Sequence, residues 1–230
     1  MARVETPFFA YLKREERDGV RKPGSMWSLE TFGRARLSKH FFMRDFLHSE
    51  IGSFYGQPNI PDDPDLAILA GGRFCEALLE PLVETFGQIT VRSGFRSYEL
   101  NDFGNQRKLN CARSEADLAG HIWDHRDAEG HMGAMATIVL PWFADRYEAG
   151  RDWRDLAWWL YDHLEFDWLQ FFPKLCAFNL GWREAPRRKI TSYIVPRGTL
   201  LAAGAEPVIG LSKRQSLYRD FPPFRGLELP

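Results

Sequence analysis

The spacing of apolar residues along the chain first predicts two helices. Residues 37–54 carry phenylalanine, leucine and isoleucine three to five positions apart, which is typical of a short amphipathic helix. A second helix is expected to begin at the Asp63-Pro64 pair, because an aspartate side chain accepts the free amides of a first turn and proline fits that turn. This helix should end at Gly87, and Pro81 should kink or restart it.

A third helix and four strands complete the pattern. Leucine and tryptophan recur every four residues between positions 152 and 172, which favours a helix with one buried stripe. Four shorter segments are predicted to be strands, because their residues alternate in polarity or form short runs rich in β-formers. These segments are residues 88–95, 135–141, 174–182 and 189–196.

The order of these elements predicts the fold class and the domain limits. Helices grouped before several strands favour an α+β fold, with a small, mostly antiparallel sheet and helices packed on it. We expect a single domain at residues 37–195. Residues 1–36 are charged and broken by proline and glycine, so they are interpreted as an N-terminal extension. Residues 196–230 are rich in glycine and proline and are interpreted as a C-terminal extension.

Composition narrows the class of protein. The chain has 30 basic and 31 acidic residues and a net charge of −1, so no net positive field would recruit nucleic acid or an anionic membrane surface. No apolar run approaches membrane-spanning length, and residues 1–22 lack the unbroken apolar core of a signal peptide. Three separated cysteines favour reduced thiols. We therefore expect a cytoplasmic protein that binds neither nucleic acid nor membranes.

Two segments resemble motifs of a known enzyme family. QITVRSGFRSYELN (residues 88–101) is similar to S-G-Y-R-S-x-E-x-N, and GHMGAMATIVLP (residues 130–141) is similar to S-x-H-x-x-G-x-A-x-D-I-x-V-P. Both patterns are those of the zinc D-alanyl-D-alanine carboxypeptidases and the related phage endolysins. Residues 37–50 and 59–87 resemble two further segments of that family, in the same order. The resemblance implies the small α+β fold that these peptidases share with the hedgehog signalling domain.

The family's zinc ligands are not matched. In the family, two imidazoles and one carboxylate hold a catalytic zinc, and a glutamate takes the proton of its water. On the ungapped match, Gly130 stands at the first histidine position and Thr137 at the aspartate position. The later W-x-H-x-S-Y strand matches residues 188–193, which puts Ile190 at the last histidine position. The resemblance thus implies a peptidase-like fold with no metal at the inherited site.

Arg96 and Ser93 match the substrate-binding segment of the family. A guanidinium can hold a carboxylate through two parallel hydrogen bonds, so the resemblance implies that Arg96 binds a peptide or another carboxylate-bearing small ligand. The alternative is structural. In that interpretation Arg96 pairs with Glu99 or Asp102 and stabilises the turn.

Three of the six histidines lie within eleven residues of one another, between the two motifs: His121, His125 and His131. His121 and His125 are four positions apart, so a helical turn would place both imidazoles on one face. A bulge could move His131 into the family's histidine position. The three residues are therefore candidate catalytic and metal-binding groups for zinc or another divalent metal. Alternatively, they cap and hydrogen-bond a polar loop, because HxxxH without the glutamate of HExxH is a weak signal.

Three hypotheses of function follow. The first is a carboxypeptidase-like protein without zinc peptidase activity that has a binding or structural role. The second is a metal-dependent hydrolase or other enzyme that uses His121, His125 and His131 in the same cleft. The third is an active cell-wall endolysin whose ligands the ungapped match misplaces.

Overall fold

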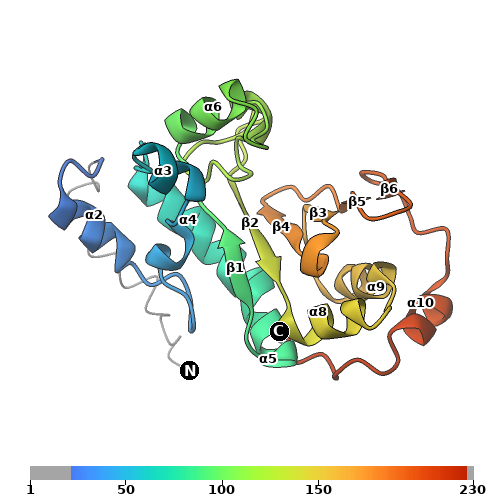
Figure 1. Ribbon diagram of the computed structural model, residues 1–230. Coiled ribbons are helices and arrows are strands. Elements are labelled where there is room, and N and C mark those ends of the chain that lie inside the picture. Colours follow the sequence, from blue (N-terminus) through green and yellow to red (C-terminus); the bar gives the residue numbers. More distant parts are fainter. Residues whose placement is uncertain (1–21, 227–230) are drawn as a thin grey trace. The chain divides into compact units, whose positions relative to one another are not determined.

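Residues 22–226 are described by the computed structural model, which has an α+β fold (Figure 1). Compact contacts divide the chain into two units. Unit 1 comprises residues 1–76 and 93–135, and unit 2 comprises residues 77–92 and 136–230. The limits expected at residues 37 and 195 remain a prediction, because contact groups within a chain do not define independently folding domains.

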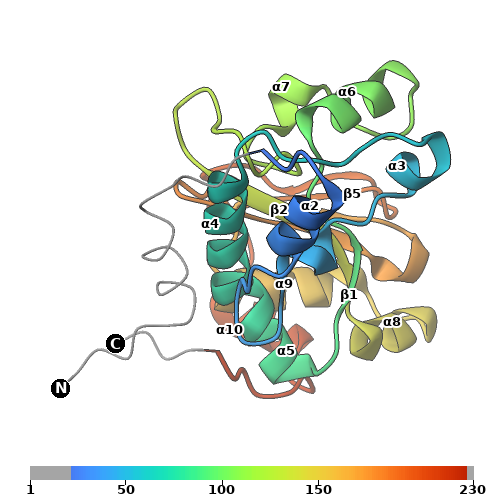
Figure 2. The same ribbon diagram turned by 90° about the vertical axis from the view of Figure 1, so that its left-hand side faces the viewer.

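Unit 1 is mainly helical. Its helices are α2 (Met26–Gly33), α3 (Glu50–Tyr55), α4 (Pro64–Phe74), α6 (Tyr98–Gln106) and α7 (Ser114–Asp117), with the 3-10 turn η1 (Met43–Phe46) between α2 and α3. Helices α6 and α7 lie side by side (Figure 2). Polar side chains cap the helix starts: Ser25 caps α2, Ser49 caps α3 and Ser97 caps α6.

The long predicted helix is confirmed at its start, its end and its interruption. Asp63 accepts a hydrogen bond from the amide of Leu66 and begins α4. The π-helical turn η2 (Cys75–Leu79) follows, and α5 (Glu80–Phe86) restarts with Pro81 in its first turn. Gly87 ends α5 in a left-handed conformation, with φ of 82°.

The helix predicted for residues 37–54 is wrong over most of its length. The amides of Leu37 and Ser38 both donate to the carbonyl of Phe41, and a bridge pairs Arg36 with Phe42. These contacts form a tight turn before η1, so only residues 50–55 are α-helical. The apolar spacing that indicated a helix is instead the spacing of side chains that the turn buries, because Leu37 and Phe41 are both buried.

Unit 2 contains most of a six-stranded mixed sheet with strand order β1-β2-β4-β3-β5-β6. The strands are β1 (Thr90–Ser93), β2 (Gly133–Val139), β3 (Trp168–Phe171), β4 (Phe178–Arg183), β5 (Lys189–Ser192) and β6 (Gly198–Leu201). Strand β3 pairs antiparallel with β4 and parallel with β5, and β5 pairs antiparallel with β6. The helices are α5, α8 (Pro141–Glu148), α9 (Trp153–His163) and α10 (Leu211–Leu217), with η3 (Lys174–Cys176) before β4.

The helix predicted for residues 152–172 ends early. Asp152 caps α9, but Leu164 already has an extended backbone, and Trp168–Phe171 is strand β3. Leu169 and Phe171 are fully buried while Trp168 and Gln170 are partly exposed, which is the alternation of a strand. A spacing of four residues satisfies both a helix and a strand, so leucine and tryptophan at that interval could not separate the two.

The sheet has one apolar face. Phe171 stacks on Phe178 with ring centroids 5.1 Å apart, and Trp153 of α9 packs on Phe171 at 4.9 Å. Ile190 points to the same face and is fully buried. This face and α9 form the apolar core of unit 2, and α10 packs beside α9 (Figure 1).

The core of unit 1 is built around Trp123. Its indole is fully buried and lies 5.1 Å from the ring of Phe46 and 5.9 Å from that of Phe74. The indole N–H donates to the carbonyl of Met135 at 3.0 Å, so the one polar atom of the side chain is satisfied. A Cβ on Gly71 of α4 would lie 2.9 Å from the Trp123 ring, so the helix can approach the indole only because this residue is glycine.

The Gly71→Ala variant should therefore be less stable. In an open helix this change stabilises by up to about 1 kcal/mol, whereas here the methyl group must displace Trp123 and is expected to cost about 1–3 kcal/mol. Urea unfolding measures the difference. Gly24→Ala is the matched control, because Gly24 is exposed and nothing lies within 4 Å of its added Cβ. A stabilised Gly71→Ala variant would contradict the close packing.

Candidate functional site

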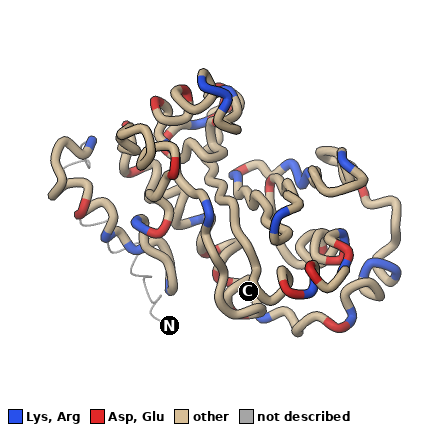
Figure 3. Tube along the Cα trace, in the orientation of Figure 1, with Lys and Arg blue, Asp and Glu red and all other residues tan. Residues whose placement is uncertain are grey.

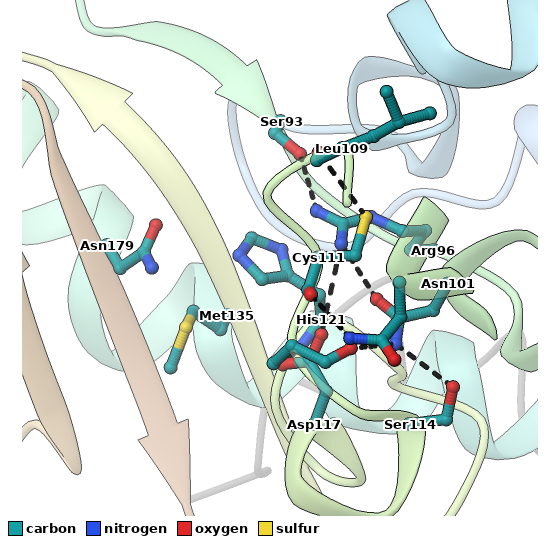
Figure 4. A network of polar contacts seen from close by, with 12 residues as sticks. Ser93, Arg96, Asn101, Leu109, Cys111, Ser114, Asp117, His121, Met135 and Asn179 are labelled. Carbon is teal, nitrogen blue, oxygen red and sulfur yellow. Dashed lines mark hydrogen bonds and ion pairs between the residues drawn. The ribbon is translucent and has the colours of Figure 1, made fainter. Parts of the chain in front are cut away.

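Arg96 lies in the connection between β1 and α6, in the middle of the SGFRS motif. Gly94 begins this connection, and an added Cβ there would lie 2.6 Å from Phe46, which explains the glycine of the motif. Ser97 caps α6 through its hydroxyl, which explains the serine. The motif therefore builds a tight strand-to-helix turn, and Arg96 projects from it into a polar network (Figure 4).

Arg96 is bound by two neutral side chains and one carboxylate. Its Nη1 donates to Asn101 Oδ1 at 2.8 Å, and its Nη2 lies 3.5 Å from Ser93 Oγ. The Asp117 carboxylate is 4.0 Å away, which makes a loose ion pair. The Arg96 side chain is 12% exposed and that of Asp117 is 10% exposed. The structural alternative named Glu99 or Asp102 as partners, but the structure places Asn101 and Asp117 there instead.

Asn101 is the final residue of the S-x-E-x-N pattern and is fully buried. Its amide nitrogen donates to the carbonyl of Ala112 at 3.0 Å and to Ser114 Oγ at 3.1 Å. All of these contacts tie α6 to the start of α7. Asn101 and Asp117 were not among the predicted site residues, although the amide oxygen of an asparagine five positions after Arg96 is a suitable acceptor for a guanidinium.

His121 is held by the same turn. Its Nδ1 lies 2.9 Å from the Gly94 carbonyl, and its own carbonyl accepts the Arg96 amide at 2.8 Å. A carbonyl can only accept, so Nδ1 carries the proton of the neutral ring and Nε2 does not. The His121 amide donates to Asp117 Oδ1, and an added Cβ at Gly120 would lie 2.7 Å from that oxygen. These contacts join three side chains in one polar cluster: Arg96, Asp117 and His121.

The three candidate histidines are not brought together in the part of the chain that the structure describes. No helix forms between His121 and His125, because residues 119–125 make turns and a bridge pairs Leu118 with Ile122. His121 binds the Gly94 turn, while His125 and His131 belong to two different groups of ligand atoms. The expected one-face pair of imidazoles is therefore absent, because the backbone turns at Gly120.

The first of these groups joins Asp62, Asp124 and His125, whose ligand atoms lie within 4.8 Å of one another. Asp124 Oδ2 accepts the Asp62 amide at 2.6 Å, and Asp124 Oδ1 lies 3.2 Å from His125 Nδ1. The Asp124 side chain is fully buried, and this burial raises the pKa of its carboxyl despite the amide and imidazole partners. Lys22 donates to Asp62, so a cation already contacts this group.

The second group, Asp127, Glu129 and His131, has a structural explanation. Asp127 Oδ1 accepts the amides of Glu129 and His131, which closes a turn. Gly130 sits in this turn with φ of 86°. The turn requires a left-handed residue at the position where the family match expects a histidine, which is a physical reason for glycine there.

The other two inherited positions lie on strands that are not neighbours. Thr137 is on β2 and Ile190 is on β5, with β4 and β3 between them. Ile190 is fully buried in the apolar core, whereas Thr137 is partly exposed and hydrogen-bonds to Asn179. Strands are about 4.8 Å apart, so three spacings put these positions about 14 Å from each other. The expectation that Thr137 and Ile190 line one place is wrong for this reason.

The neighbour of Thr137 is Asn179 on β4. The Thr137 hydroxyl donates to Asn179 Oδ1 at 2.6 Å. Register continues this row: Asn179 pairs with Gln170 of β3, and Gln170 pairs with Thr191 of β5. We call Thr137, Asn179, Gln170 and Thr191 the polar row. The sequence analysis missed Asn179, although the alternation of residues 174–182 already placed it opposite the buried Phe178 and Leu180.

Comparisons with known proteins give no relative for this site. No protein-family model matches the chain, and no curated protein and no solved structure matches it either. Among the described helices, none is both long and apolar enough to cross a membrane. Basic and acidic residues are interspersed along the trace rather than gathered in blocks of one sign (Figure 3). The carboxypeptidase resemblance and the role of each site residue therefore stay predictions.

Arg96→Ala should destabilise the protein by about 1–3 kcal/mol, because it leaves the buried Asn101 Oδ1 without its donor and removes the positive charge beside the Asp117 carboxylate. Arg92→Ala is the matched control, because Arg92 lies on β1 and is exposed. Its expected change is within about 0.5 kcal/mol. Thermal and urea unfolding of both variants measure the difference. Equal stability of the two variants would show that the network does not hold the turn.

Proposed function

We propose that this protein has a D-alanyl-D-alanine carboxypeptidase-like, hedgehog-type fold without zinc peptidase activity at the inherited site, and that it binds a carboxylate-bearing ligand through Arg96. The observation that carries the first part is the contact between Thr137 and Asn179. The second part is supported by the placement of Arg96 at the end of β1. A cytoplasmic location belongs to the same proposal, because Cys75, Cys111 and Cys176 form no disulfide within the described residues.

The Thr137–Asn179 contact identifies the strands that would hold the family's aspartate and last histidine. Two ligands of one ion must come within a few ångströms, and Asn179 of the neighbouring strand β4 lies that close to Thr137, whereas β5 is not next to β2. If the resemblance holds, Asn179 rather than Ile190 is the counterpart of the last histidine. A hydroxyl and a carboxamide then occupy positions that need a carboxylate and an imidazole. Both are poor zinc ligands, and they satisfy each other by a hydrogen bond.

Arg96 is suited to a ligand carboxylate for two reasons. Its position is fixed by Asn101, so little side-chain entropy is lost when a ligand binds. Within residues 22–226 its ion-pair partner is Asp117 at 4.0 Å, which is longer than a direct charge-assisted hydrogen bond. His121 lies beside the same turn, with its Nδ1 on the Gly94 carbonyl. The Arg96 guanidinium can orient an anionic group without a metal.

The ligand test uses a blocked tripeptide that ends in D-alanyl-D-alanine, with the Arg96→Ala and Arg92→Ala variants. The wild-type protein should bind it without hydrolysis, and Arg96→Ala should weaken binding by roughly 1.5–3 kcal/mol. Arg92→Ala should bind like the wild type. Hydrolysis that a chelator abolishes would overturn the proposal, and so would equal binding by both variants.

Restoring the two ligands should restore metal binding. The double variant Thr137→Asp, Asn179→His places a carboxylate and an imidazole on adjacent strands, so its affinity for Co²⁺ or Zn²⁺ should rise at least tenfold over wild type. Calorimetry and the visible spectrum of Co²⁺ measure this gain.

The matched control for this prediction is Thr137→Asp, Thr191→His. Thr191 belongs to the same polar row, but two strands separate it from Thr137, so this pair should gain nothing. Equal gains in metal affinity in both double variants, or no gain in either, would show that β2 and β4 do not form the inherited site.

A second candidate function rests on the group of Asp62, Asp124 and His125, which offers the mixed carboxylate and imidazole donors that divalent ions accept. In this alternative the protein is a metal-dependent enzyme. It uses only one of the three predicted histidines. The ion would replace the Lys22 ammonium at Asp62.

If this alternative holds, Zn²⁺ or Mn²⁺ should bind, and Asp124→Asn should weaken binding at least tenfold. Lys22→Ala should strengthen binding, because it removes a competing cation. Burial raises the pKa of Asp124, so its proton competes with the metal at a higher pH than for an ordinary aspartate, and affinity should fall as the pH falls through that range. Asp63→Asn, which keeps the helix cap next to the group, should bind like wild type. Retention of full affinity by Asp124→Asn would exclude the group.

A further inference from the structure

A cavity of about 500 Å³ lies within unit 2, and none of its lining residues belongs to the proposed site. Its walls come from the first half of α9, from β6, from the segment between β6 and α10, and from α10 itself. This volume is in the range of small-molecule sites, which run from about 300 to 1,000 Å³. All of the lining residues belong to one compact unit, so the cavity is defined without reference to the other unit.

The floor of the cavity is apolar. Trp158 and Leu201 are 5% and 4% exposed, and Leu217 and Ile209 are partly buried beside them. The segment at residues 202–208 forms the other wall, and most of it is exposed. An apolar body of a ligand would therefore find contacts on the floor and open access from the side of this segment.

Acidic groups outnumber basic groups in the lining. The carboxylates are Asp152, Asp155 and Glu206, and the cations are Arg154 and Lys213. Arg154 is already committed, because its guanidinium and its amide donate to Asp152. The lining thus has one carboxylate more than it has cations. Because Asp152 and Arg154 form an ion pair with each other, the other charged groups of the lining are Asp155, Glu206 and Lys213.

Asp155 has a carboxylate oxygen that can accept a further hydrogen bond. Its Oδ2 accepts Arg151 Nε at 2.6 Å, whereas its Oδ1 accepts no hydrogen bond from any residue in the described range 22–226. Its side chain is only 13% exposed, and burial raises the pKa of the carboxyl in spite of Arg151. A carboxylate oxygen of a cavity-lining residue that has no donor among the described residues can accept a hydrogen bond from a ligand.

We infer that this cavity binds a small amphipathic amine, with its apolar ring on Trp158 and Leu201 and its ammonium group on Asp155 Oδ1. An ammonium provides both a donor and the compensating positive charge, whereas a hydroxyl provides only the donor and a carboxylate would be repelled. The inference does not depend on the function proposed for Arg96.

Tryptamine is a suitable probe, because its indole fits the apolar floor and its amine is charged at neutral pH. Its neutral and acidic analogues, tryptophol and indole-3-propionate, keep the ring and change only the head group. Calorimetry at neutral pH should give tryptamine an affinity roughly tenfold or more above that of either analogue. Equal affinities of the three would overturn the role of Asp155. Absence of tryptamine binding at about 5 mM would overturn the site.

Two variants locate the binding. Asp155→Asn should reduce tryptamine affinity to the level of tryptophol. Asp220→Asn is its matched control, because Asp220 also pairs with Arg151 but does not line the cavity. Ala205→Trp should fill the cavity and abolish binding of all three compounds without loss of stability, because Ala205 lines the cavity and is exposed. Two results would contradict the inference. One is unchanged tryptamine binding in Ala205→Trp. The other is a loss of tryptamine affinity in Asp220→Asn that equals the loss in Asp155→Asn.

Discussion

Burial of the Trp123 indole is the constraint on which unit 1 depends. The ring is surrounded by aromatic side chains from a 3-10 turn and a helix, and its N–H must find an acceptor inside the protein because water is excluded. The Met135 carbonyl supplies that acceptor. The loop that carries Trp123 also carries His121 and Asp124, so packing of the indole sets where these polar groups can be. The glycine at position 71 is a further consequence, because only hydrogen fits against the ring.

The candidate site of unit 1 is a product of this packing. Residues 118–125 contain no regular helix, yet His121 and Asp124 are buried, as is Asp117 at the end of α7. Buried polar groups require partners, and each of them is paired with a side chain or a backbone group of the Gly94–Arg96 turn or of the loop before α4. The same interactions that could position a ligand therefore also hold the loops. A variant of Arg96 must be compared with the wild type in both stability and ligand affinity.

In unit 2, side chains alternate between the two faces of each β-strand, so the core residues and the polar row occupy different positions. One face of the sheet carries the aromatic and aliphatic residues that pack on α9, and the polar row crosses the strands by a different set of positions. Ile190 belongs to the apolar set and also lies three strands away from β2, so the sequence match placed it far from Thr137. Within the polar row, the Thr137 hydroxyl donates to the Asn179 carboxamide.

Local signals in the sequence determined the helix that starts at Asp63-Pro64, its restart at Pro81, its end at Gly87 and the α+β class, because capping, ring geometry and left-handed glycine act within a few residues. They could not separate a turn from a helix at Leu37–Phe41, since both bury the same apolar side chains. Only the tertiary structure decided that His125 contacts Asp124 while His121 contacts Gly94, and that Thr137 faces Asn179 instead of Ile190. Strand order and loop packing join residues far apart in the chain, and the spacing of residue types along a single sequence carries no record of which distant segments become neighbours.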